Sequence, residues 1–167
     1  MSYRRQARVS ENTWILVADR SKATIYQSIW PELEYFRKIH RLEHPEGTTR
    51  RDEDSRSRPG RLAGPGATRQ PGEPPTDYRH RSAQEFAISI IERLQQGRMN
   101  NEFGRLIIVA PALMLGVLRV RIPAPLGKTV ALTLRKHLVD APVREIMEQV
   151  NDALVARSDM ELAKFPA

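Results

Sequence analysis

The sequence predicts an α/β fold with the element order βββαβαβα, a mixed five-stranded sheet with helices packed on it. Two observations lead to this prediction. Residues 14–18 and 106–110 are short, uninterrupted apolar runs, which are typical of strands buried on both faces. Residues 83–94 and 143–154 carry apolar side chains at the 3.6-residue spacing of a helix. Helices that alternate with strands in the second half indicate an α/β sheet.

The first third of the chain predicts a three-stranded meander. Thr13 to Ala18 form a central strand, and Asp19 to Ser21 form a tight turn in which Asp19 accepts local backbone hydrogen bonds. Residues 23–29 return as an antiparallel strand. Residues 35–42 mix basic and apolar side chains, as expected of an edge strand, where charges deter association between sheets.

The composition changes at Pro45. From there to Arg81 the chain has six Pro and five Gly but almost no aliphatic residues, so this segment cannot bury a core. We expect residues 45–81 to form a long disordered loop inside a single α/β domain over residues 13–157. Residues 1–12 and 158–167 are expected to be flexible ends.

A capping box at Ser82 and Glu85 predicts the start of the first helix, and Gly97 is its expected stop. Residues 106–110 follow as a strand buried on both faces. Pro111 ends this strand and can open a helix directly, which leaves free backbone N–H groups at the strand end.

Proline residues then lead into a strand over residues 129–134, and the last helix begins near Asp140. Right-handed crossovers through the helices place the first, fourth and fifth strands parallel, with the meander continuing the sheet antiparallel on the other side. This arrangement is ribonuclease H-like.

The chain has 167 residues, a formal net charge of +7 and no cysteine. The charge favours acidic partners such as nucleic acid, and the absence of cysteine excludes thiol chemistry and fits a cytoplasmic location. The N-terminus lacks the apolar stretch of a secretory signal, and no segment is apolar enough to span a membrane.

No catalytic residue, metal ligand or cofactor is predicted. A ribonuclease H-like nuclease needs several carboxylates to hold two metal ions about 4 Å apart, but the chain from Phe103 to Val139 contains no acidic residue. The glycines between Pro59 and Pro75 match neither a P-loop nor a dinucleotide-binding motif, and no serine-elbow motif is present.

The positive signal is electrostatic. Basic residues without intervening carboxylates occur on the predicted parallel elements, and arginines recur in the long loop, so external phosphates are natural counter-ions. The alternative is a solvated basic face and, for the loop, a solvated tether. The candidate nucleic-acid-binding residues are Arg105, Arg119, Arg121, Lys128, Arg135, Lys136 and His137 on the domain and Arg58, Arg61 and Arg69 in the loop. Asp19 and Arg20 are candidates for a ligand-binding or turn role.

The sequence also resembles the bacterial host attachment protein family, described as proteins required for attachment to host cells. The resemblance rests on TWILVADRSKATIY, HPEGTTRRDEDSRSRPGR, AQEFAISIIERL, and LIIVAPALMLGVLR followed by KHLVDAPVREI, and it covers about residues 13–150. The family usually has Ala-Asp-Gly after the first strand, whereas this chain has Ala18, Asp19 and Arg20.

The family in turn resembles the middle domain of eukaryotic and archaeal peptide-release factors, which implies a ribonuclease H-like fold and a relation to translation. In those factors a Gly-Gly-Gln loop promotes hydrolysis of peptidyl-tRNA. The corresponding loop here reads from Gly64 to Gln70 without Gly-Gly-Gln. The resemblance therefore implies ribosome or RNA binding and disfavours hydrolysis.

We therefore expect a non-enzymatic cytoplasmic binding domain that engages ribosomal or other structured RNA. One alternative is a cytoplasmic regulatory or interaction protein that affects attachment to host cells or surfaces. The other is a hydrolase acting on peptidyl-tRNA or RNA.

Overall fold

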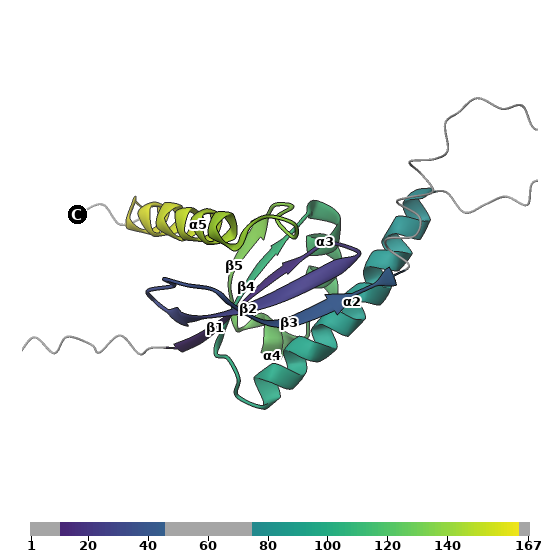
Figure 1. The fold of residues 1–167 in the computed structure, drawn as a ribbon, viewed down its shortest axis with the longest axis horizontal. Helices are drawn as coiled ribbons and strands as arrows, with labels where there is room; N and C mark the ends of the chain where they lie inside the picture. Colours follow the sequence, from purple (N-terminus) through teal and green to yellow (C-terminus); the bar gives the residue numbers. More distant parts are fainter. Residues whose placement is uncertain (1–10, 46–74, 164–167) are drawn as a thin grey trace, which may run out of the picture.

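The computed structural model describes residues 11–45 and 75–163 and contains a five-stranded mixed sheet (Figure 1). The strands lie side by side in the order β3-β2-β1-β4-β5. Their bounds are β1 Glu11–Ala18, β2 Lys22–Trp30, β3 Arg37–Glu43, β4 Arg105–Ala110 and β5 Val130–Arg135. The predicted α/β class, with its mixed five-stranded sheet, is confirmed.

The strand directions also agree with the prediction. β1 pairs antiparallel with β2, and β2 pairs antiparallel with β3, so the first third is a meander. β1, β4 and β5 run parallel to one another. β1 is the central strand and β3 is an edge strand, as their residue patterns predicted.

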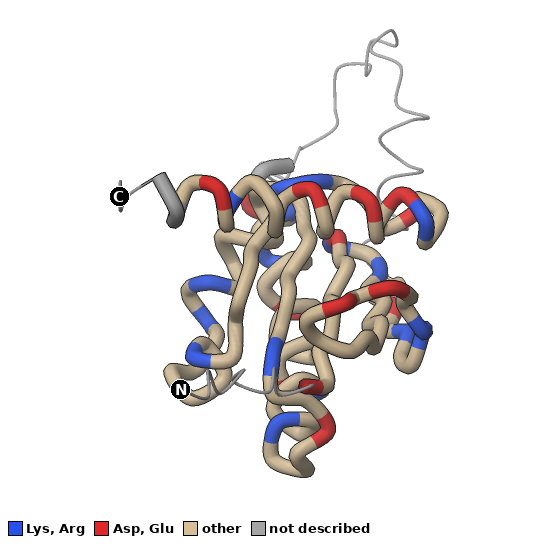
Figure 2. The backbone as a smooth tube through the Cα atoms, turned by 90° about the vertical axis from the view of Figure 1, so that its left-hand side faces the viewer, with Lys and Arg blue, Asp and Glu red and all other residues tan. Residues whose placement is uncertain are grey.

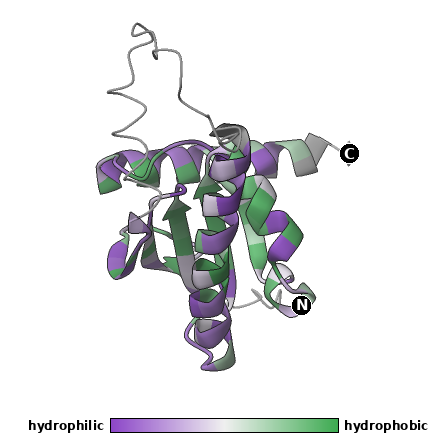
Figure 3. Ribbon diagram, turned by 90° about the vertical axis from the view of Figure 1, so that its right-hand side faces the viewer, coloured by the Kyte–Doolittle hydropathy of each residue, from purple (hydrophilic) through white to green (hydrophobic). Residues whose placement is uncertain are grey.

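Helices cover both faces of the sheet (Figures 1 and 3). On one face lie α2 Pro75–Met99, α3 Ala112–Arg121 and the single turn α4 Ala124–Gly127. On the other face lies α5 Val143–Ala163. α2 turns mainly hydrophilic residues away from the sheet, as Figure 3 shows.

Alternation along β1 builds the two cores. Trp14 and Leu16 face α2 and α3, whereas Ile15 and Val17 face α5, and all four side chains are buried. Gly97 is needed for this packing, because a Cβ atom added there would lie 2.4 Å from Cη2 of Trp14. The sequence thus has a glycine at the point where α2 packs against Trp14, the largest fully buried side chain.

The predicted start of the first helix is wrong. α2 begins at Pro75 instead of Ser82, so residues 75–81 of the predicted loop are helical. Ser82 is a buried interior position, and its hydroxyl finds no hydrogen-bond partner in the described part of the chain. Pro75 in the first turn and Asp77 near the positive end of the helix dipole are the true start signals.

Other helix ends differ as well. Gly97 does not stop α2, which continues to Met99; the last helix begins at Val143, and it includes residues 158–163 of the predicted flexible tail. The remainder of the predicted loop, including Arg58, Arg61 and Arg69, lies outside the described residues.

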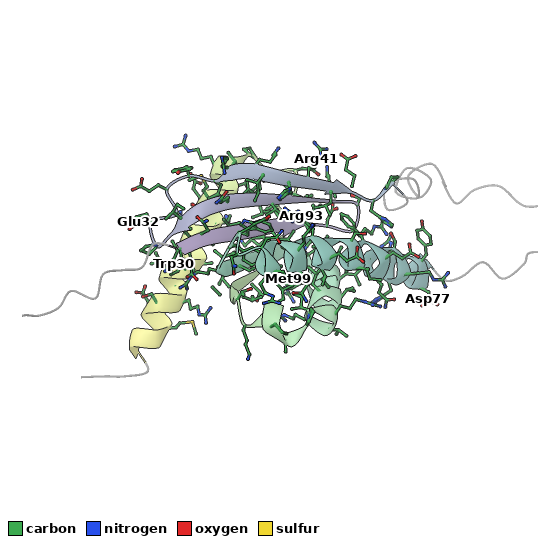
Figure 4. All side chains as sticks on the ribbon, turned by 90° about the horizontal axis from the view of Figure 1, so that it is seen from below. Trp30, Glu32, Arg41, Asp77, Arg93 and Met99 are labelled. Atoms are coloured by element: carbon green, nitrogen blue, oxygen red, sulfur yellow. The ribbon has the colours of Figure 1, made fainter. Side chains whose placement is uncertain are left out.

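A polar cluster joins the edge strand β3 to α2. Arg93 points from α2 toward the sheet (Figure 4), contacts the Nε2 atom of His40 and donates a 3.2 Å hydrogen bond to Glu102. Its guanidinium also lies 5.2 Å from the ring centroid of Trp14. Burial, followed by the positive charge of Arg93, lowers the pKa of His40, while Glu102 acts in the opposite direction. The net effect lowers the pKa of His40 and favours its neutral form.

Candidate functional site

A pocket lies at the edge of the sheet where the three parallel strands end, called here the carboxyl edge. Parallel strands direct their carboxyl ends to the same edge, which is where ligands bind in many α/β sheets. The pocket has a volume of about 330 Å³. It is lined by Asp19, Arg20, Ser21, Arg79, Pro111, Leu113, Met114 and His137.

Asp19 follows β1 directly and organises the turn into β2. Its Oδ1 atom accepts hydrogen bonds from the backbone N–H groups of Ser21 and Lys22, at 2.7 and 2.8 Å, and from the Ser21 hydroxyl at 2.9 Å. Asp19 thus accepts three hydrogen bonds from residues of its own turn. The Asp19 residue is buried. One oxygen of its carboxylate, Oδ1, is fully used by hydrogen bonds within the turn.

The second oxygen of Asp19 faces His137. The Nε2 atom of His137 lies 3.3 Å from Oδ2, and the imidazole is half exposed to the pocket. Burial alone would raise the pKa of Asp19, but the hydrogen bonds from Ser21, Lys22 and His137 more than offset it and hold this pKa below its usual value. Asp19 is thus a stable carboxylate.

Two side-chain contacts tie the β1–β2 turn to the segment that follows β5. One is the pair of Asp19 with His137, and the other is an ion pair of Lys22 with Asp140. The backbone adds a third connection within the same edge, because the N–H of His44 donates to the Ser21 carbonyl at 2.7 Å. The floor of the pocket is therefore anchored from several elements.

The first turn of α3 forms one wall of the pocket. Pro111 is the N-cap and offers no side-chain cap, and the first helical hydrogen bond runs from the N–H of Leu115 to the Pro111 carbonyl at 2.9 Å. Leu113 and Met114 lie within the turn whose N–H groups have no partner inside the helix. The positive end of the helix dipole favours an anion at this wall.

Basic side chains surround this wall. Arg20 comes from the β1–β2 turn, Arg79 from α2, and His137 from the segment after β5. Arg135 and Lys136 are exposed immediately before His137. The four basic residues Arg20, Arg79, Arg135 and Lys136 outnumber the single carboxylate of Asp19, so the local balance of formal charge favours a negatively charged ligand.

The predicted basic residues fall into two separate groups. Arg135, Lys136 and His137 lie at the carboxyl edge. Arg121 and Lys128 lie toward the opposite end, because α3 runs away from the carboxyl edge and β5 returns to it. The two ends of a six-residue strand are separated by about 17 Å.

Two of the predicted residues have specific partners. Arg105 forms an ion pair with Glu11 at 3.2 Å and stacks on Trp30, with its guanidinium 4.1 Å from the ring centroid. Arg119 donates a 3.1 Å hydrogen bond to the Thr133 hydroxyl. The segment from Phe103 to Val139 has no acidic residue, but the charge of Arg105 is matched by Glu11, which comes from a distant part of the sequence.

Sequence reasoning missed Arg79 and Ser21 as pocket residues. Arg79 was assigned to the disordered loop because the start of α2 was placed too late. The segment from Pro75 through Asp77 carried the usual start signals of a helix, proline in the first turn followed by an acidic residue, and these would have brought Arg79 onto the helix.

A family model described as "Protein required for attachment to host cells" matches residues 14–150. This chain belongs to that host attachment family. The predicted family resemblance is therefore confirmed. No curated protein matches the host attachment domain.

One solved structure, described as "Archaeal protein", is similar to this chain. The alignment covers 90% of this chain and 39% of the archaeal chain. The two share 14% sequence identity at a TM-score of 0.40. The chain therefore spans well under half the length of that structure.

Neither a metal cluster nor a membrane span is found in the described part of the chain. Over residues 11–45 and 75–163, no three His, Asp or Glu side chains gather closely enough to hold a metal ion. Across the same ranges, no helix is both long and apolar enough to cross a membrane.

Proposed function

We propose that this host attachment domain is a non-enzymatic binding protein of the cytoplasm that holds phosphate groups of ribosomal or other structured RNA at its carboxyl edge. We further propose that the sheet is ribonuclease H-like and related to the middle domain of peptide-release factors. The strand order, with a meander followed by two parallel strands, supports this relationship. The observation that carries the functional proposal is the pocket lined by Arg20, Arg79 and His137.

The chemistry of the pocket favours a phosphate. Guanidinium groups donate several hydrogen bonds to phosphate oxygens, and the start of a helix attracts the same charge. The buried carboxylate of Asp19 stays in the turn, where its hydrogen bonds keep it ionised. Asp19 therefore serves to hold the pocket wall, and the basic side chains bind the ligand.

The spacing of the charges favours an extended ligand. The carboxyl-edge group and the group of Arg121 and Lys128 are separated by about the length of β5, about 17 Å. A mononucleotide cannot reach both groups, whereas the backbone of a folded RNA can. Contacts of this kind recognise phosphate and shape and contribute little sequence preference.

Co-sedimentation with ribosomes tests the proposal. The full chain should pellet with ribosomes at low salt and be released as the salt concentration rises, because phosphate contacts displace counter-ions. Bovine serum albumin added to the same tube is a control for trapping in the pellet. Absence of the host attachment domain from the pellet at low salt would contradict ribosome binding.

A second candidate function follows from the family description, which concerns attachment to host cells. In this alternative the domain is a cytoplasmic regulatory or interaction protein that affects attachment indirectly. Cell fractionation separates this alternative from a direct role at the surface. Recovery of the chain on the outer surface would contradict both the regulatory alternative and the cytoplasmic RNA-binding proposal.

A further inference from the structure

A second cavity lies on the α3 face of the sheet, away from the carboxyl-edge pocket. It has a volume of about 220 Å³ and opens between α3, α4 and β5. Its floor consists of core side chains, because Ile108, Leu115 and Leu118 are all buried. Ile122 and Val130 add apolar walls that are only partly buried. The interior of this cavity is thus almost entirely aliphatic.

Gly127 keeps one side of the cavity open. A Cβ atom built at this residue would meet a single neighbour, Cγ2 of Ile122 at 3.6 Å, which is an ordinary contact distance. The glycine is therefore not required by close packing. Its lack of a side chain leaves space between α4 and β5 that a ligand can occupy.

Arg119 is the single charged residue that lines this cavity. Its guanidinium donates to the neutral hydroxyl of Thr133 at 3.1 Å. No carboxylate of the described residues lies within ion-pair distance of it, in contrast to Arg105, which is paired with Glu11. An aliphatic cavity with one cation at its rim is complementary to an apolar molecule that ends in an anionic group.

We propose that this cavity binds a small aliphatic or aromatic carboxylate, with the apolar part between α3 and β5 and the carboxylate on Arg119. The volume limits the size of the ligand. An apolar protein cavity of about 150 Å³ holds benzene, so about 220 Å³ accommodates about nine non-hydrogen atoms, which is enough for an eight-carbon chain whose carboxylate oxygens lie at the rim on Arg119. For a ligand of that size we expect a dissociation constant of about 0.1–1 mM. This site does not depend on the proposed RNA contacts.

Titration of the full-length chain with sodium octanoate, followed by two-dimensional ¹H–¹⁵N NMR, tests the proposal. The amide signals of Gly127, Val130 and Leu118 should shift in a saturable way, while those of the β1–β2 turn stay unchanged. 1-Octanol, which has the same apolar chain without the charge, should bind at least threefold more weakly. Inorganic phosphate, which has the charge without the chain, should not shift these signals.

Three variants separate the contributions of charge and cavity. Arg119→Gln should weaken octanoate binding at least threefold and leave octanol binding unchanged. Arg121→Gln removes an equivalent charge two residues away on the same helix and should leave octanoate binding unchanged. Gly127→Leu should fill the cavity and abolish binding of both ligands.

Three outcomes would overturn the proposal. The first is the absence of a saturable shift of these amide signals at about 10 mM octanoate, 10 times the upper end of the expected dissociation constant. The second is equal affinity for octanoate and octanol. The third is equal weakening of octanoate binding by Arg119→Gln and by Arg121→Gln. The NMR spectra of the variants also report folding, and Arg119 and Arg121 are exposed, so neither substitution is expected to disturb the fold.

Discussion

At the scale of the residue, Asp19 shows how one side chain can set the geometry of the proposed site. Its Oδ1 atom accepts three hydrogen bonds from the β1–β2 turn, and its Oδ2 atom faces His137. The same turn carries Arg20 to the pocket. The sequence predicted this role because aspartate commonly bonds to backbone N–H groups two or three residues further on.

Asp19→Ala should destabilise the protein, because it leaves the N–H groups of Ser21 and Lys22 without their acceptor. We expect a loss of about 1–3 kcal/mol in the free energy of unfolding, measured by urea denaturation at pH 7. Asp152→Asn, at an exposed position of α5, is the control and should change this free energy by less than about 0.5 kcal/mol. Equal effects of the two substitutions would contradict the role of Asp19.

The charge of Asp19 has its own signature in pH dependence. Because the folded-state pKa is below the unfolded value, the stabilisation is present above about pH 4 and is lost as the pH falls through the folded pKa. The stability difference between the wild-type protein and Asp19→Asn should therefore shrink on acidification. Urea denaturation at several values between about pH 2 and 7 measures it. A constant difference would show that the charge does not contribute.

Gly97 and Gly116 form a matched pair of helical glycines. Gly97→Ala should destabilise the protein by about 1–3 kcal/mol, because the added methyl group overlaps the ring of Trp14. Gly116→Ala meets no atom within 4 Å and should stabilise α3 by about 0.5–1 kcal/mol. Urea denaturation of both variants is the measurement. Tolerance of Gly97→Ala would contradict the packing described for α2, and destabilisation by Gly116→Ala would contradict the open space beside Gly116 of α3.

At the scale of the element, the contact of His40 with Arg93 joins β3 to α2. The folded-state pKa of His40 is lowered, so the unfolded chain binds more protons as the pH falls below about 6.5. The stability should therefore decrease as the pH falls through this window and on to the folded pKa. In His40→Gln, urea denaturation between about pH 4 and 8 should show a smaller decrease. If the stability of His40→Gln decreased as steeply as that of the wild-type protein, His40 would not contribute to the pH dependence.

The element scale also explains what the sequence could not predict. The strands β1 and β4 were evident because continuous apolar runs suit strands covered on both faces. The start of α2 was missed because Ser82 and Glu85 match a capping box, whereas the structure buries Ser82 inside the helix. A local motif cannot reveal whether another turn of helix precedes it, and Arg79 was absent from the predicted site for that reason.

At the scale of the whole molecule, acidic and basic residues are unevenly distributed. Acidic residues recur along α5, as Figure 2 shows, and the carboxyl edge gathers Arg20, Arg79 and His137 around the start of α3. The sequence indicated an excess of positive charge, and the candidate residues were predicted as one group. Their division into two groups follows from the strand directions, because residues that precede and follow the parallel strand β5 lie at its opposite ends.

The salt dependence of RNA binding tests the central proposal most directly. Fluorescence anisotropy with a labelled RNA hairpin gives the slope of the logarithm of the binding constant against the logarithm of the salt concentration. Arg20→Gln combined with Arg79→Gln should weaken binding and reduce this slope by about two, about one for each phosphate that is no longer neutralised. Lys38→Gln combined with Arg41→Gln removes the same charge from β3 and should leave the slope unchanged. Equal slopes for both double variants, or no binding by the wild-type protein, would contradict a phosphate site at the carboxyl edge.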